Sequence, residues 1–349
     1  MSNSVPFITA MLAQPETLAS AHSGLNQQLR DAKMPAWKPE ETVAVVAMGA
    51  SHYSGIAFTA LMSAAGYRSV NLVASELAPI PAGYQPADHY LIISESGRSP
   101  EPINAALSFT TGRRIVISNF PEAPIRAVAD VSLGLGGFDD SLVYTAGYTA
   151  TLLAYGLLME TAGIPRAGAG LDEIPRTVRE ALIDYDDVTR AAGAKIAGAS
   201  AVDVIGQGPS FAAAAETALM LREGLRIPAA AFETLQYLHG PMESADANSA
   251  LIIFGDDREL TVPDSVLDTG TKVILVTSRT PNQIPSLAHP NLTVINIDPD
   301  LTGFARCIIE ALVGQMIVAR GIGHKPFEIE DFLYDHNDTK ISLEDSRQG

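Results

Sequence analysis

The chain has 349 residues, of which 47% are hydrophobic and 18% charged, a composition typical of a globular protein large enough for two domains. Its formal net charge of −17 argues against nucleic acid and anionic membranes as partners, because both require a basic face, but it does not exclude a small anionic ligand. The single cysteine, Cys307, excludes an intrachain disulfide and a cysteine metal cluster, and its apolar helical surroundings are typical of a core residue.

The N-terminal 20 residues lack the basic region and the long apolar run of a secretory signal. No window approaches the roughly 18–20 uninterrupted apolar residues that a membrane-spanning helix needs. We therefore expect a cytoplasmic protein that does not enter the membrane.

Short apolar runs rich in β-branched residues alternate along the chain with helical stretches rich in alanine and leucine. The expected strands are 42–48, 69–75, 89–94, 114–119 and 130–135, then 202–206, 250–255, 272–278 and 292–297, with long helices between the two series over about 145–198. Continuously apolar strands separated by helices predict parallel sheets covered on both faces. The fold class is therefore a doubly wound α/β architecture.

The two series of strands resemble each other. Residues 45–62 parallel residues 204–220, with Gly49 aligned on Gly208, and the similarity continues into the third strand of each series. An internal repeat of this length predicts two copies of one α/β domain.

The copies differ after that third strand. The first continues into the Ser/Gly-rich loop 94–102 and the second into the acidic segment 255–260. Ser94, Ser96 and Ser99 supply hydroxyl donors, Gly97 permits a tight turn, and a helix N-terminus follows the loop. These features fit a phosphate site in the first copy only. An ordinary turn with Ser99 as the helix cap fits the same residues, so the motif alone leaves both interpretations open.

The turn after the first strand, 48–55, has the same strand–turn–helix form and offers Ser51 as a further donor. Dinucleotide-binding and P-loop motifs are absent, and the His, Asp and Glu residues lack metal-ligand spacing. We expect no metal and no cofactor.

Glu216 and Glu223 are seven residues apart on an alanine-rich helical stretch, so both carboxyl groups lie on one face with Met220 between them. His239 follows in a Leu-His-Gly-Pro corner. A solvated helix face and a structural histidine would account for the same residues, so their spacing does not decide their role.

The segments "GASHYSG", "SESGRSPE" and "AETALMLREGLRIPAAAFETLQYLHGP" resemble the double SIS (sugar isomerase) domain family, in particular the isomerase half of glucosamine-6-phosphate synthases. Residues 11–18 resemble that family's entry helix and residues 337–344 its C-terminal lysine tail. The resemblance implies two tandem flavodoxin-like SIS domains, a homodimer, and a sugar 6-phosphate bound at the carboxyl ends of the first domain's strands.

The expected organisation is a helical segment, a phosphate-binding SIS domain, a helical linker, a second SIS domain and an active-site tail. Their bounds are 1–40, 41–165, 166–200, 201–325 and 326–349.

The resemblance also implies roles for single residues. The phosphate would be contacted by Ser51, Ser94, Ser96 and Ser99, with Glu95 beside them, and Thr145 would lie near the sugar hydroxyls. Glu223 would move a proton between C1 and C2. The sugar ring would be opened by His239 of a neighbouring subunit, and Lys340 would engage the ketose carbonyl. These residue types suit aldose–ketose exchange, which needs a carboxylate base, a group that shuttles protons near neutral pH, and a cation at a carbonyl.

The chain departs from the synthases at Met220 (a lysine there), Gln236 (a glutamate) and Glu95 (a glutamine). Ser2 follows Met1, and a glutaminase domain is not expected, so ammonia would have to come from a partner for synthesis. The expected activity is therefore that of an amino-sugar-phosphate deaminase/isomerase. A fructosamine-phosphate deglycase, a simple ketose–aldose phosphate isomerase, and a non-catalytic sugar-phosphate sensor are the alternatives.

Overall fold

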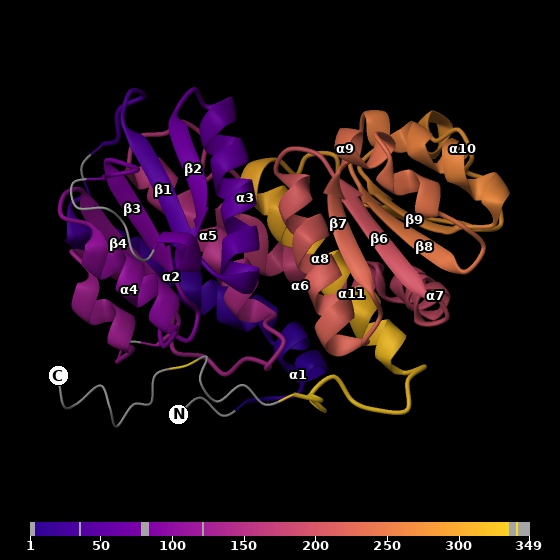
Figure 1. Cartoon of the computed structure of the whole chain (residues 1–349), viewed down its shortest axis with the longest axis horizontal. Coiled ribbons are helices and arrows are strands. Elements are labelled where there is room, and N and C mark those ends of the chain that lie inside the picture. The colour runs from indigo at the N-terminus through magenta and orange to yellow at the C-terminus, as the bar shows by residue number, and fades with distance from the viewer. Residues whose placement is uncertain (1–3, 35, 78–83, 121, 335–339, 341–349) are drawn as a thin grey trace.

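Two parallel β-sheets lie side by side, with a layer of helices between them (Figure 1). The structure is a computed structural model, and it describes residues 4–34, 36–77, 84–120, 122–334 and 340. Of the tail segment 337–344, only Lys340 falls within these described residues.

The first sheet has five strands in the order β2-β1-β3-β4-β5, all parallel. They are β1 (Thr42–Ala47), β2 (Arg68–Val73), β3 (His89–Ile93), β4 (Arg113–Ser118) and β5 (Val131–Gly134). Five of the six residues of β1 are buried and the other is partly buried, as expected of a central strand covered on both faces.

The second sheet repeats this topology in the order β7-β6-β8-β9-β10, again all parallel. Its strands are β6 (Ala201–Gly206), β7 (Ala229–Glu233), β8 (Ser249–Phe254), β9 (Lys272–Thr277) and β10 (Leu292–Asn296). The flavodoxin-like order in both sheets confirms the predicted tandem α/β fold. Gly49 and Gly208, aligned by the sequence repeat, also share a positive φ, of 54° and 57°.

Strand β7 is absent from the sequence-based expectation. Its residues, "AAAFE", include no β-branched side chain, and four of the five are only partly buried because β7 is an edge strand. β7 forms because it pairs with β6, and strand propensities alone do not predict this pairing.

The helices are α1 (Phe7–Leu12), α2 (Gln14–Ala32), α3 (Gly49–Ala64), α4 (Pro100–Ser108), α5 (Ala146–Thr161), α6 (Ile174–Asp184), α7 (Asp186–Ala197), α8 (Ser210–Gly224), α9 (Thr234–Leu238), α10 (Val262–Val266) and α11 (Gly303–Ile322). Within the helical region expected over about 145–198, the chain is interrupted at Tyr185, where ψ is 1°. Residues on either side of this break continue as α6 and α7.

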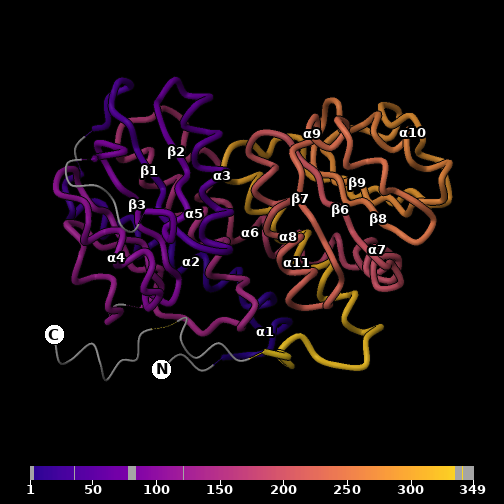
Figure 2. The backbone as a smooth tube through the Cα atoms, viewed as in Figure 1, coloured from indigo at the N-terminus to yellow at the C-terminus, as the bar shows by residue number. Residues whose placement is uncertain are grey.

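The layer between the sheets positions the site. Helix α5 is buried at every residue from Ala146 to Met159, because it is apolar on all sides. Helix α11 is buried over most of its length, and most of its residues are apolar. Around them α3 of the first half packs against α8 of the second (Figure 2). Side chains of α8 are thereby held close to the turn that follows β1.

The end of the chain returns to its beginning. The segment after α11 runs beneath the molecule past α1 (Figure 2), and the backbone N–H of Phe7 donates a hydrogen bond to the carboxylate of Glu330. The guanidinium of Arg226, just beyond α8, lies 3.9 Å above the ring of Phe327, and Ile329 is buried. These contacts hold residues 327–330 against α1 and the end of α8.

Within the described ranges, no helix is both long enough and apolar enough to cross a membrane. Cys307 is buried on α11, and burial raises the pKa of its thiol well above the usual range.

Candidate functional site

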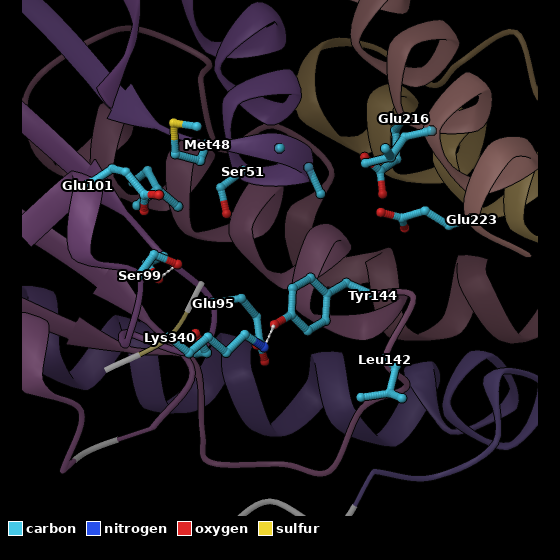
Figure 3. A pocket seen from close by; sticks show the side chains of 16 residues that line it. Met48, Ser51, Glu95, Ser99, Glu101, Leu142, Tyr144, Glu216, Glu223 and Lys340 are labelled. Atoms are coloured by element: carbon cyan, nitrogen blue, oxygen red, sulfur yellow. Dashed lines mark hydrogen bonds between the residues drawn. The ribbon is translucent and has the colours of Figure 1, made fainter. Parts of the chain in front are cut away.

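A cavity of about 400 Å³ opens at the carboxyl ends of β1 and β3 and is closed on its far side by α8 (Figure 3). A crevice at this end of a doubly wound sheet is where such folds bind ligands. Of the residues singled out from the sequence, those that line it are Ser51, Ser94, Glu95, Ser96, Ser99, Glu223 and Lys340. The fold thus gathers segments separated by almost 290 residues around one space.

The loop after β3 is held as a tight turn. Gly97 has φ +62°, its N–H donates to the carbonyl of Ser94 at 2.9 Å, and its carbonyl accepts from Ile125 at 3.0 Å. Ser99 stands at the N-cap of α4, but its hydroxyl makes no capping hydrogen bond and instead accepts one from Ser94 Oγ at 3.3 Å. Capping therefore does not explain this serine, and its hydroxyl faces the cavity.

We expect Gly97→Ala to weaken sugar-phosphate binding at least tenfold. A Cβ at this position would lie 2.3 Å from the Cβ of Ala123, and a left-handed backbone costs a non-glycine residue about 1–2 kcal/mol, so the loop must rearrange. Thermal-shift titration with fructose 6-phosphate measures the effect. Gly66→Ala is the control, since Gly66 also has a positive φ but a Cβ there meets nothing within 4 Å. Equal losses in both variants would show that the shape of the 94–99 loop is not required.

The turn after β1 offers a second set of donors. Gly49, with φ +54°, begins α3, and the preceding residue, Met48, gives no side-chain cap, so the first N–H groups of the helix are not capped by that side chain. Ser51 lies on this first turn and lines the cavity (Figure 3). The N-termini of α3 and α4 therefore meet at one space, an arrangement that favours an anion.

The segment before α5 contributes Tyr144, which sequence reasoning missed. The family resemblance implied a place near the sugar hydroxyls for the neighbouring Thr145. In the structure Thr145 is fully buried, and its hydroxyl donates to Asp140 at 2.7 Å. Asp140 also accepts from the N–H of Gly147 at 2.7 Å, and so caps α5 from five residues before its N-cap. This capping fixes the segment and turns the ring of Tyr144 into the cavity (Figure 3). No simple sequence motif predicts that Tyr144 lines the cavity, because the capping residue Asp140 lies outside the usual N-cap position.

Lys340 reaches the cavity from the C-terminal tail. Its ammonium donates a hydrogen bond to the hydroxyl of Tyr144 at 3.3 Å and lies 5.8 Å from the centre of that ring (Figure 3). Among the lining residues that the structure describes, it supplies the cationic side chain, whereas glutamates come from several elements.

Glu216 and Glu223 both project from α8 toward the cavity, and their carboxyl groups point toward each other (Figure 3). Glu216 is 1% exposed and its Oε2 has no partner. Burial, then the charges of Glu223 and Asp140, raise its pKa well above the usual range and so favour its neutral form.

Glu223 lies at the mouth of the cavity, where one side of it meets solvent and the other is surrounded by protein. The loss of hydration on the protein side raises its pKa to about 7. A carboxyl group with such a pKa can both take and return a proton at neutral pH. Met220, between the two glutamates, is fully buried and adds no charge.

His239 does not line this cavity. It is the exposed residue at the C-terminal end of α9, in the second half of the chain. At the start of the same helix, the carboxylate of Glu233 accepts a hydrogen bond from the N–H of Gln236.

In the second half, the loop after β8 carries a carboxylate, Asp256, at the place that corresponds to the serine loop. Asp256 accepts hydrogen bonds from Thr277 Oγ1 at 2.7 Å and from the N–H of Ser278 at 2.8 Å, and it forms an ion pair with Arg306. Arg306 also pairs with the fully buried Glu310 at 2.8 Å. Burial by itself would raise the pKa of Asp256, but these contacts outweigh it and hold the pKa well below its usual range. A fixed negative charge thus stands where the first half presents serine hydroxyls.

No cluster of three or more His, Cys, Asp or Glu side chains suited to a metal ion occurs in the part of the chain that the structure describes.

Comparison with known proteins adds to this geometry. No family model matches the chain. It is 24% identical over 306 residues to a glutamine–fructose-6-phosphate aminotransferase (isomerizing) of Aeropyrum pernix, an alignment covering 82% of this chain and 49% of the relative. The chain spans less than half the length of the curated relatives it matches.

Two solved structures share the fold over nearly the whole chain. The C-terminal domain of a glucosamine-fructose-6-phosphate aminotransferase from Francisella tularensis has a TM-score of 0.78 at 17% identity, covering 91% of this chain and 95% of that one. A glucosamine-6-phosphate deaminase from Thermotoga maritima has a TM-score of 0.71 at 17% identity, covering 93% and 96%.

Proposed function

We propose that this chain, a double SIS-domain protein resembling the isomerase part of the glutamine–fructose-6-phosphate aminotransferases, converts an amino-sugar 6-phosphate such as glucosamine 6-phosphate to a ketose phosphate and ammonia. One observation carries the proposal. A single cavity joins a serine-rich turn at two helix N-termini to Glu223, a carboxyl group with a pKa of about 7.

The proposed chemistry balances without a cofactor. In the open-chain aldosamine, the carboxylate of Glu223 removes the proton from C2, and the electron pair left behind forms the C1–C2 double bond. The π electrons of the C1 aldehyde move to O1, which takes a proton from solvent, and the product of this step is an enolamine. The protonated Glu223 then returns a proton to C1, leaving an iminium at C2. Water adds to this carbon, and ammonia leaves to give the ketone. Glu223 ends in its starting form.

The neighbouring groups suit this sequence. Ser51, Ser94, Ser96 and Ser99 hold the phosphate with the helix N-termini behind them. Lys340, hydrogen-bonded to Tyr144, is placed to stabilise negative charge that develops on the sugar oxygen. His239 of a second copy of the chain would supply the proton transfer that opens the ring, and the active form would then be a homodimer.

Incubation of the purified chain with glucosamine 6-phosphate should release ammonia and fructose 6-phosphate in equal amounts, measured by coupled enzymatic assay. A matched incubation with fructose 6-phosphate and ammonium checks the reverse direction. Release of neither product would contradict the proposal. Conversion of fructose 6-phosphate to an aldose phosphate without ammonia would instead favour a simple isomerase, and tight binding without turnover would favour a sensor.

A further inference from the structure

Glu95 is an acidic side chain at the centre of the proposed anion site. It is 6% exposed, and its Oε1 accepts a hydrogen bond from Asn119 Nδ2 at 2.8 Å. Asn119 is itself fixed, because it also donates to the carbonyl of Phe138 at 2.8 Å. Behind the carboxyl group, Gly147 lies so close that a Cβ there would come within 2.6 Å of Glu95 Cγ. Glu95 therefore cannot swing away when an anion enters.

The groups around Glu95 are of both signs. Asp140 and Tyr144 face it from the segment before α5, Lys340 from the tail, Glu101 from α4, and Glu216 and Glu223 from α8 across the cavity. Arg98 shares its loop. Tyr144 gives Glu95 a hydrogen bond, and Lys340 attracts its negative form. Burial and the charge of Asp140 outweigh these two and the Asn119 contact, so the pKa of Glu95 is raised to about 7.

An ionised carboxylate held beside a phosphate dianion is repelled by it, and burial strengthens the repulsion because little water screens it. A neutral carboxylic acid has an O–H donor, whereas phosphate oxygens at pH 8 only accept. Asn119 donates to Oε1, so a proton on the carboxyl group would be carried by Oε2.

We propose that Glu95 binds the phosphate-bearing ligand as a neutral carboxylic acid, so that occupation of the serine loop is coupled to the uptake of one proton. The inference rests on the proposed function only in taking this loop as the phosphate site. In this role, Glu95 sets the pH range over which the site binds its ligand.

The test is isothermal titration calorimetry with fructose 6-phosphate, a probe whose only ionisation near neutrality is that of its phosphate, with a pKa of about 6. Titrations at pH 8 in two buffers of different ionisation enthalpy give the number of protons bound. The Glu223→Gln chain is used, because it removes the other carboxyl group that titrates near pH 7 and prevents turnover. The matched control is the same chain with Glu95→Gln added, which keeps the shape and remains neutral.

We expect close to one proton taken up per site at pH 8 by the Glu223→Gln chain, and binding that weakens roughly fivefold between pH 7 and pH 8. The chain that also carries Glu95→Gln should take up none and bind with an affinity that is constant over this range. Uptake near zero in the first chain, or equal uptake in both, overturns the inference while leaving the phosphate site intact. Failure of fructose 6-phosphate to bind at any pH overturns both the inference and the proposed function. Circular dichroism of each variant establishes that it is folded.

Discussion

Glu223→Gln is expected to lower kcat with glucosamine 6-phosphate by roughly 10²–10⁴-fold, the range that general base catalysis contributes. Glutamine has nearly the same shape, but its amide cannot accept a proton from carbon. Because the helix is unchanged, binding of fructose 6-phosphate in a thermal-shift titration should stay within about threefold of the unmodified chain. Initial rates at saturating substrate measure the loss.

Glu180→Gln is the matched control, since it makes the same chemical change on α6, where Glu180 is exposed and pairs with Arg176 at 2.8 Å. It should leave kcat unchanged. If Glu223→Gln retained more than a third of the activity, the base would have to be another group. Glu216 would be a poor substitute, because burial raises its pKa and disfavours the carboxylate form that accepts a proton.

Arg306→Met is expected to lower the free energy of unfolding by about 3 kcal/mol at pH 7, in the range found when one partner of a buried ion pair is removed. The substitution leaves the buried Glu310 and the largely buried Asp256 without their cation. Urea unfolding followed by circular dichroism gives the midpoint shift. Arg176→Met, which breaks exposed pairs on α6, is the control and should cost less than about 1 kcal/mol.

The pH dependence of this loss has a definite sign. The folded pKa of Asp256 lies below its unfolded value of about 4, so its contribution to stability is present above pH 4 and disappears as the pH falls through the folded value. The difference between the Arg306→Met and unmodified chains should therefore be smaller at pH 3 than at pH 7. A difference that grows on acidification would show that the Asp256–Arg306 pair is not the source.

Most of the fold was predictable because its signals are local. Nine of the ten strands were expected from runs of apolar and β-branched residues, which are longest in inner strands such as β1, β8 and β9. The repeat that aligned Gly49 with Gly208 appears in the structure as two matching left-handed turns. The exception, β7, depends on pairing with β6, which is a tertiary effect.

Site residues that belong to a sequence motif were predictable. Residues that only tertiary contacts bring to the site were not. The loop serines and Glu223 belong to recognisable segments, and they line the cavity. Tyr144 depends on the cap that Asp140 gives to α5, and the partnerless state of Glu216 depends on how α8 packs. The role proposed for His239 requires a second copy of the chain. Such dependencies cannot be seen in residue spacing.

The most direct test of the account is whether Glu223 exchanges a carbon-bound proton with solvent. With the reaction run in D₂O, ¹H NMR should show deuterium at C1 of the fructose 6-phosphate formed, because Glu223 lies at the mouth of the cavity, where its proton exchanges with water. The Glu223→Gln chain should give no deuterated product beyond the enzyme-free background. Turnover with equal deuterium incorporation in both chains would contradict the assignment of Glu223 as the proton-transfer base.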